Sequence, residues 1–289
     1  MLPAQAILPA IPDHARYLEL TAIPDRDPAP VLRALAAEVD DALVIGFGAG
    51  LVAGLGAEVP GLHGFPALTG PGCVVPSTQA DILCWIKGTD RGDIAARARH
   101  LTALLAPAFR VERLTDGFRH RGGLDLSGYE DGTENPTGDD AIDATFVRTG
   151  PWTGSSFASV QKWQHDLTHF ETLPQDLRDH IIGRRQSDNE ELEDAPDFAH
   201  VKRTAQESFT PEAFLSRRSM PWSDASGEGL MFVAFGHALA AFEAQLHRMT
   251  GAEDGIIDGL FRFSRPVTGA HYWCPPLKEG ALDIGLIGL

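Results

Sequence analysis

The order of strand-like and helix-like segments restricts the fold of this chain more than any other feature of its sequence. The N-terminal part reads as β-α-β, then an insertion rich in Gly and Pro, then β-α-β again. This is the order of the split βαβ, or ferredoxin-like, unit, whose sheet is antiparallel. We expect its strands at 15–22, 43–48, 81–88 and 110–118, and its helices at 29–42 and 93–109.

The C-terminal part repeats this scheme. The helical pattern at 237–251 ends in Gly, the residue most common just past a helix C-terminus. The chain is therefore expected to be an α+β protein of two duplicated ferredoxin-like units, of the dimeric α+β barrel type, with antiparallel sheets. We place the units at 1–135 and 136–289, the second with a C-terminal tail at 278–289. In the second unit, strands are expected at 155–167, 212–222, 229–236 and 259–267, and helices at 174–183 and 237–251.

Composition limits the class of partner. The 289 residues, 43% of them apolar, are enough to bury a core in each unit. A net charge of −16 repels phosphate backbones and argues against a nucleic acid partner. The longest apolar stretch, 42–57, is shorter than a membrane-spanning helix and carries five glycines, so no membrane partner is expected.

The cysteines and the start of the chain bear on location. Cys73, Cys84 and Cys274 are widely spaced and odd in number, which argues against a disulfide framework or a thiolate metal site. The first residues, MLPAQAILPA, lack the basic region of a secretion signal. We therefore expect a cytoplasmic protein.

Residues 128–136, GYEDGTENP, place three carboxylates on a short segment with two glycines and a proline. Gly128 and Gly132 permit a positive φ or the close approach of a ligand. One interpretation is a surface turn in which Asp131 and Asn135 bond nearby amides. The other is that the turn aims Asp131 at a ligand, and the segment alone does not decide between them.

Two further motifs suggest other chemistry. The segment HDLTH spaces His165 and His169 as in the HExxH of zinc hydrolases, but an Asp stands where the general-base Glu belongs. On a strand, the two imidazoles would share a face yet lie far apart. Residues 46–54 contain GxGxxA after a strand, as dinucleotide folds do, yet no acid follows at the expected distance. A zinc hydrolase stays open as an alternative, whereas packing better explains the glycines of 46–54.

A histidine and a pair of arginines complete the candidates. His200 lies between an acidic segment and a basic pair, although a lone His is more often structural than a ligand. Arg217 and Arg218 lie on a predicted strand, so one guanidinium should face inward and the other solvent. A buried guanidinium requires an anion or a polarised oxygen species nearby.

Taken together, these motifs resemble those of the dye-decolorizing peroxidases, a family of haem enzymes, and in particular its B-type bacterial branch. The family's GxxDG followed by TENP is present at 128–136, and its R-x-S/N-[LM]-P pattern runs from Arg217 to Pro221. The segments IIGR, AHVKR and LFRFSRPVTGA agree with further family segments. The matches span about residues 120–277 in family order, whereas the N-terminal half agrees only in its element pattern and VIGFG. The family fold, two ferredoxin-like domains with haem chiefly in the C-terminal one, agrees with the duplication.

The resemblance implies a role for each candidate. His200 would be the proximal ligand of the haem iron through Nε2, and Asp258 is the candidate acid on its other ring nitrogen, unless Asp258 is only a turn residue. Asp131 would move a proton between the two peroxide oxygens, and Arg217 would stabilise negative charge on the departing oxygen. Ser219, expected on the same face as Arg217, would hold a distal water.

Other roles carried over from the family lie further from the iron. Arg218 would be the outward arginine, Arg184 a partner of a haem propionate, and Glu134 a ligand for a reducing cation at the haem edge. Large reductants cannot reach a buried iron, so surface aromatic residues would relay electrons. The candidates for this relay are Trp152, Trp163, Trp222, Trp273 and Tyr129.

The implied function is a haem b peroxidase with one haem per chain, which reduces hydrogen peroxide and oxidises organic (dye-like, phenolic) or metal reductants by one-electron steps. The alternative is a haem-binding or haem-handling protein with little turnover. Units of this kind suggest a homo-oligomer, a dimer or larger. Residues 282–285 resemble the peptide that loads some relatives into encapsulin shells, but Leu286 replaces the usual small polar residue. A tail docked at the oligomer interface is the alternative.

Overall fold

The structure is a computed structural model that describes residues 2–289. Its strands are β1 (His14–Ala22), β2 (Leu43–Phe47), β3 (Leu68–Gly70), β4 (Cys73–Val75), β5 (Ile82–Gly88), β6 (Phe109–Phe118), β7 (Ser156–His165), β8 (Ser216–Arg217), β9 (Met220–Asp224), β10 (Gly227–Gly236), β11 (Ser264–Pro266), β12 (Ala270–Cys274), β13 (Leu277–Lys278) and β14 (Ala281–Leu282). Its helices are α1 (Ala29–Ala36), α2 (Ala49–Gly54), α3 (Arg91–Leu105), α4 (Gly138–Thr145), α5 (Leu167–Thr172), α6 (Gln175–Ile182), α7 (His200–Arg203) and α8 (Ala240–Met249), with 3-10 turns η1 (Gln206–Ser208), η2 (Gly259–Arg262) and η3 (Ile284–Ile287).

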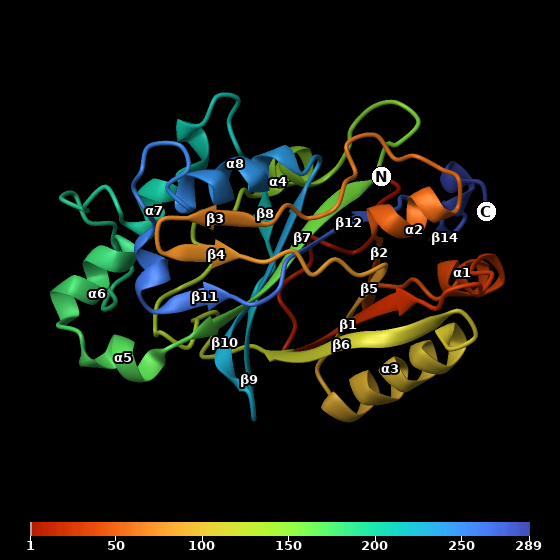
Figure 1. The fold of residues 1–289 in the computed structure, drawn as a ribbon, viewed down its shortest axis with the longest axis horizontal. Helices are drawn as coiled ribbons and strands as arrows, with labels where there is room; N and C mark the ends of the chain where they lie inside the picture. The colour runs from red at the N-terminus through yellow and green to blue at the C-terminus, as the bar shows by residue number, and fades with distance from the viewer. Residues whose placement is uncertain (1) are drawn as a thin grey trace.

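One antiparallel sheet of ten strands joins the two halves of the chain. Its order is β6-β1-β5-β2-β12-β7-β10-β8, with β11 also paired to β7 and β9 to β10. The halves meet where Trp273 of β12 pairs with Phe47 of β2. Figure 1 shows α1 to α3 beside the N-terminal strands and α8 beside the C-terminal ones. The α+β class with antiparallel sheets, predicted from the sequence, is confirmed.

The core that links the halves consists of large side chains on the face of the sheet shared by both. Tyr17 and Trp85 of the N-terminal strands are fully buried together with Phe235 and Tyr272 of the C-terminal strands. The rings of Trp85 and Phe235 stack at 5.7 Å between centroids. Successive side chains of a strand point to opposite faces of the sheet, so the side chains on one face of strands from both halves can pack into this shared core.

Most N-terminal elements lie where the sequence predicts them. The helix expected at 29–42 is shorter, because α1 ends at Ala36 and Asp40 then pairs with Leu43 in an isolated bridge. The longer α3 begins at a well-formed cap, since the Asp90 side chain accepts hydrogen bonds from the amides of Gly92 and Asp93.

The C-terminal half departs from expectation in three places. The strand predicted at 259–267 is instead the 3-10 turn η2 followed by the short strand β11, because Asp258 caps the turn through the Leu260 amide. Strand β12 was not predicted at all, and the strand expected at 212–222 is interrupted between β8 and β9. The interruption places Ser219 off the strands, next to Arg217.

The glycines of 46–54 serve packing, so a dinucleotide site there is ruled out. A Cβ on Gly46 would lie 2.7 Å from the Cβ of Tyr272, and one on Gly48 would lie 2.4 Å from the carbonyl oxygen of Ala80. Strand β2 pairs antiparallel on both sides, with β5 and β12, whereas dinucleotide folds require parallel strands.

The C-terminal tail packs on its own chain. After the β13-β14 hairpin, Leu282, Ile284 and Ile287 are buried in the core of the N-terminal half, against residues such as Phe47. These contacts lie within one chain, so the resemblance of 282–285 to a shell-loading peptide and the docking of the tail at an oligomer interface both stay predictions from the sequence.

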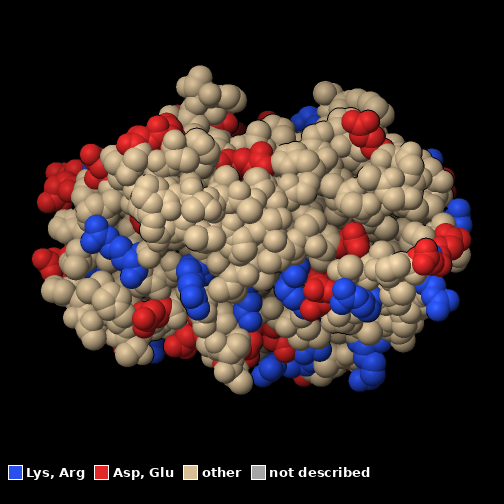
Figure 2. Space-filling model, in the orientation of Figure 1, with Lys and Arg blue, Asp and Glu red and all other residues tan. Residues whose placement is uncertain are grey.

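The distribution of charged side chains on the surface, the state of the cysteines and the lengths of the apolar helices bear on the partners and the location predicted from the sequence. On the face in Figure 2, acidic side chains gather along the upper left margin, and basic ones lie mainly in the lower half. Cys73, Cys84 and Cys274 are buried, and each is a free thiol. Within residues 2–289, no helix is both long and apolar enough to cross a membrane.

Candidate active site

A cavity in the C-terminal half lies between the turn at 128–136, helices α7 and α8, and strands β7 and β10. Two further hollows adjoin it, and Asp131 and Arg217 border all three. His200 borders two of them. Much of the wall is apolar, including Trp163, Ile182, Phe232, Phe242, Leu246 and Phe263. Asp131, His200 and Arg217 therefore border one largely apolar cavity.

His200 is held by a buried carboxylate. It is the first residue of α7, and its Nδ1 lies 2.8 Å from Oδ2 of Asp258, which is 1% exposed. The other Asp258 oxygen accepts a hydrogen bond from the Leu260 amide, so the turn role and the histidine contact coexist. Within residues 2–289, Nε2 of His200 has no hydrogen-bond partner. This nitrogen is thus left to bind a ligand.

The turn that carries Asp131 requires its glycines. Gly128 and Gly132 adopt φ of 88° and 82°, which side chains with a Cβ rarely adopt. The Asp131 carboxylate accepts no hydrogen bond in the described part of the chain, 2–289, although it borders the cavity. The interpretation of the segment as a turn in which Asp131 and Asn135 bond nearby amides therefore does not fit Asp131, although Asn135 does accept a hydrogen bond from the Arg217 amide.

Asn135 fixes this turn to β8, and sequence reasoning gave it no such role. Its Oδ1 accepts a hydrogen bond of 2.7 Å from the Arg217 amide, and its Nδ2 donates one of 3.0 Å to the Arg217 carbonyl. The side chain thus completes a strand-like pairing with one residue of β8. It sets the position of Asp131 relative to Arg217.

We expect Asn135→Ala to lower the free energy of unfolding by about 1–3 kcal/mol, because two backbone groups of Arg217 lose their partners. Urea denaturation followed by circular dichroism measures the change. Asn135→Asp keeps the acceptor for the Arg217 amide but not the donor, so its loss should be smaller. Equal stability of the Ala variant and the parent would contradict this role.

The two arginines point to different sides, as predicted, but Arg218 is half-buried and not open to solvent. Arg217 borders the cavity, and its buried Nε has no hydrogen-bond partner among residues 2–289. Arg218 lies off the cavity and donates hydrogen bonds to the carbonyls of Ile7 and Leu8. Burial lowers the pKa of Arg218. Strand alternation gives the face of a residue but not what covers that face, so the cover over Arg218 was not predicted.

Ser219 lies beside Arg217, although between the strands and not on one. Its Oγ is buried, has no hydrogen-bond partner in the described part of the chain, and borders the same small hollow as Asp131 and Asn135. A buried hydroxyl and a buried guanidinium nitrogen left unpaired are costly unless a ligand or water completes them. The unpaired Arg217 Nε and Ser219 Oγ therefore indicate that a polar ligand or a water binds on their side of the cavity.

Arg184 and Glu134 are paired with each other. Nη2 of Arg184 donates to Oε1 of Glu134 and, at 3.1 Å, to Oε2 of Glu191. Arg184 is 9% exposed, whereas both carboxylates are largely exposed. The three residues border the hollow that also contains His200. An incoming carboxylate would compete with Glu134 and Glu191 for this guanidinium.

The HDLTH segment does not form a zinc site. Strand β7 ends at His165, and Asp166 then caps α5, which carries His169. His165 instead contacts Oδ1 of Asp125 at 3.3 Å and Oγ of Ser264 at 2.6 Å. Burial raises the pKa of Asp125, but hydrogen bonds from His165 and Ser127 outweigh it and hold that pKa below its usual value. Within 2–289, neither histidine of the segment belongs to a cluster of three metal-ligating groups.

Four of the five aromatic relay candidates are buried, contrary to the prediction that they lie on the surface. Tyr129 and Trp163 border the cavity, and Trp222 donates a hydrogen bond from Nε1 to the Trp163 carbonyl. Trp273 is fully buried, and Trp152 is partly exposed beside it. The pair of Trp163 and Trp222 thus leads from the cavity wall through buried structure.

Sequence comparison identifies relatives over most of the chain. Residues 123–279 match the family described as "Dyp-type peroxidase, C-terminal". The chain is 32% identical over 224 residues to the dye-decolorizing peroxidase of Mycobacterium tuberculosis, with 75% of this chain and 67% of that protein covered. It is 29% identical over 252 residues to the dye-decolorizing peroxidase of Mycolicibacterium paratuberculosis, covering 78% and 71%.

Solved structures of dye-decolorizing peroxidases match the fold of this chain over nearly its whole length. The dye-decolorizing protein from V. cholerae matches with a TM-score of 0.86 and 29% identity, covering 98% of each chain. A variant of DypB from Rhodococcus jostii RHA1, solved in complex with haem, matches with a TM-score of 0.88 and 27% identity, covering 96% of this chain and 97% of that one. The duplicated ferredoxin-like fold expected from the sequence agrees with these neighbours.

Proposed function

The chain belongs to the Dyp-type peroxidase family and is a haem peroxidase, and from this premise we propose that it binds one haem b in the cavity described above, reduces hydrogen peroxide, and oxidises organic or metal reductants by one-electron steps. The observation that carries the proposal is the shared cavity. His200, with a free Nε2, borders it, and so do Asp131 and the unpaired side chain of Arg217.

The residues present fit a haem. A flat apolar macrocycle suits the apolar wall, and the neutral imidazole of His200, held by Asp258, is a suitable axial ligand for iron. The orphaned Arg217 Nε and Ser219 Oγ suit the polar side where peroxide would bind. When bound, haem supplies the iron centre that accepts electrons from the reductant and passes them to peroxide.

We assign proton transfer to Asp131. Peroxide must lose a proton from one oxygen and gain one on the other before its O–O bond breaks heterolytically. A carboxylate without hydrogen-bond partners, placed at the edge of the cavity, can accept the first proton and return it, directly or through a water. The turn formed at Gly128 and Gly132 would place this carboxylate, and Asn135 ties the turn to β8.

Arg217 and Ser219 would assist Asp131 by stabilising charge and by binding a water. A guanidinium keeps its charge at ordinary pH and would stabilise the negative charge that develops on the departing oxygen. The Ser219 hydroxyl would hold a water in the hollow it shares with Asp131. Arg184 would exchange Glu134 or Glu191 for a haem propionate, and the freed Glu134 would be available to a reducing cation.

The proposal is tested by an absorption spectrum of protein purified with haem supplied, taken before and milliseconds after one equivalent of hydrogen peroxide. A Soret band that changes rapidly supports the peroxidase. A band indifferent to peroxide would favour the alternative, a haem-handling protein with little turnover. Absence of a haem band would overturn the proposal. The homo-oligomer, the encapsulin shell and the cytoplasmic location stay predictions from the sequence.

Asp258→Asn tests the support of the histidine. The amide can still accept from the Leu260 amide, but it no longer places a negative charge at Nδ1 of His200. We expect haem to remain bound, the reaction with peroxide to slow by about 10- to 100-fold, and the iron reduction potential to rise. Redox titration of the Soret band measures the potential. An unchanged potential would assign Asp258 to the turn alone.

A further inference from the structure

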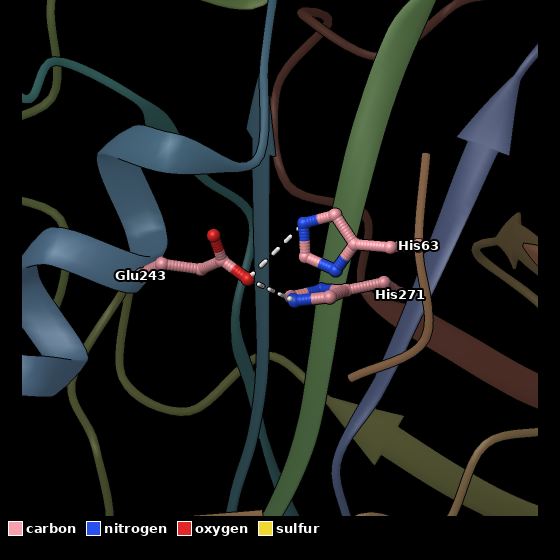
Figure 3. Close-up of side chains that lie close together, drawn as sticks. All are labelled: His63, Glu243 and His271. Carbon is pink, nitrogen blue, oxygen red and sulfur yellow. Dashed lines mark ion pairs between the residues drawn. The ribbon is translucent and has the colours of Figure 1, made fainter. Parts of the chain in front are cut away.

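Outside the peroxidase cavity, three side chains from distant parts of the chain converge on one point. His63 lies between α2 and β3, Glu243 in the first turn of α8, and His271 in β12. Figure 3 shows the Glu243 carboxylate directed from α8 toward both imidazole rings. Their ligand atoms lie within 4.8 Å of one another, and within residues 2–289 no other group of three such side chains does this.

The distances suit a tetrahedral metal. Oε1 of Glu243 lies 3.4 Å from Nε2 of His63 and 3.5 Å from Nε2 of His271. In a tetrahedral zinc site with bonds of about 2.0–2.1 Å, neighbouring ligand atoms are separated by about 3.3 Å. The same carboxylate oxygen is thus near the correct spacing from both imidazole nitrogens before any ion is bound.

Each imidazole is also oriented as a ligand. Nδ1 of His63 lies 3.0 Å from the carbonyl oxygen of Gly64, which can only accept, so that nitrogen carries the proton. Nδ1 of His271 lies 3.0 Å from Oγ of Ser159. In metal sites the second ring nitrogen usually bonds a partner of this kind, which orients the ring and leaves the other lone pair for the metal. The carbonyl fixes the tautomer of His63, whereas the Ser159 hydroxyl can donate or accept and is therefore compatible with the tautomer of His271 that a metal requires.

His271 supplies an observation independent of the clustering. The residue is 0% exposed, yet among residues 2–289 no group meets hydrogen-bond geometry with its Nε2, and the Glu243 carboxylate lies 3.5 Å away. Burial lowers the pKa of His271, which favours the neutral ring that a metal requires. The rings of Phe65 and Phe242 pack against it at 4.6 and 5.8 Å between centroids and fix its position. In the tautomer with the proton on Nδ1, the buried Nε2 lone pair faces a carboxylate, which is unfavourable without a cation between them.

We propose that His63, Glu243 and His271 form a binding site for a divalent transition-metal ion, of which Zn²⁺ is the representative. Two imidazoles and one carboxylate suit zinc, cobalt or nickel better than magnesium or calcium, which prefer oxygen ligands. The side chains of His63 and Glu243 are 50% and 29% exposed, so an ion can enter and a water can complete the fourth position. The ion would tie an N-terminal loop to α8, whose Phe242 and Leu246 line the peroxidase cavity.

The test uses the full chain, freed of metal with a chelator, both with and without haem. Zinc binding is measured by isothermal titration calorimetry, and bound zinc per chain by elemental analysis after gel filtration. We expect one zinc per chain, unaffected by an excess of Mg²⁺ or Ca²⁺. His63→Ala and Glu243→Gln change partly exposed side chains, so both should fold, and each should weaken zinc binding at least about ten-fold.

His100→Ala is the matched control. His100 is exposed and its Nε2 lies 3.1 Å from Oε1 of Glu38, so it forms an imidazole–carboxylate pair without a second imidazole. Its replacement should leave the zinc affinity unchanged. No retained zinc in the parent protein would overturn the proposal and leave three side chains that form ion pairs only. Zinc that binds equally to the parent, His63→Ala and Glu243→Gln would overturn it as well.

Discussion

Replacing His200 with Ala is expected to give a folded protein that no longer retains haem. The only imidazole nitrogen at the cavity that is both free and backed by a buried carboxylate disappears, and Asp258 is left with its charge unpaired on that side, as judged within residues 2–289. Loss of a partner behind a metal ligand already costs about 10- to 100-fold in affinity, so loss of the ligand should cost more than 100-fold. Haem per chain after gel filtration, read from the Soret band, measures the loss.

The control for this variant is His237→Ala, which removes an exposed imidazole from outside the cavity and should leave the Soret band unchanged. Added imidazole should partly restore the band of His200→Ala, because the free ligand can occupy the space of the lost side chain. Full haem occupancy with an unaltered Soret band in His200→Ala would show that another group binds the iron.

Helix α3 was predicted because it buries one stripe of residues, Ile94, Ala98, Leu101 and Leu105, and exposes the rest, so its period can be read directly. Strand β2 is fully buried, and it was predicted from its continuous apolar run LVIGF. All five residues of β12 are also buried, but its segment AHYWC shows neither a regular alternation nor an aliphatic run, and it was missed. The metal cluster was missed with it, because His271 had no assigned element that could bring it to His63 and Glu243.

The candidate active site was predicted mainly from motifs, and its geometry shows why spacing alone was insufficient. His200 and Asp258 are 58 residues apart, and no periodicity relates a short helix to a distant 3-10 turn. The pairing of Arg184 with Glu134 and the cover over Arg218 depend equally on how distant segments pack. Asn135 illustrates the same limit, since its two hydrogen bonds to Arg217 cross 82 residues.

A large loss in the rate of reaction with peroxide is expected when Asp131 or Arg217 is replaced. Asp131→Asn and Arg217→Leu should each retain haem and slow the reaction with peroxide by about 10²- to 10³-fold, as loss of a proton-transfer group or of a charge-stabilising donor does. Asn135 holds the backbone of Arg217 and not its side chain, so Arg217→Leu should leave the turn attached to β8. Stopped-flow absorbance measures the rate, with Asp139→Asn, an exposed carboxylate on α4, as the control.

The double variant then reveals how the two residues divide the work. If Asp131 and Arg217 act on the same peroxide in one step, their effects will not add, and the double variant will react about as slowly as the slower single variant. If each acts in a separate step, the two losses in activation free energy will add when both steps contribute to the observed rate. Both single variants reacting at the parent rate would contradict the assignment, because the proton and the negative charge would then be handled by groups outside the hollow that Asp131 and Arg217 share with Ser219.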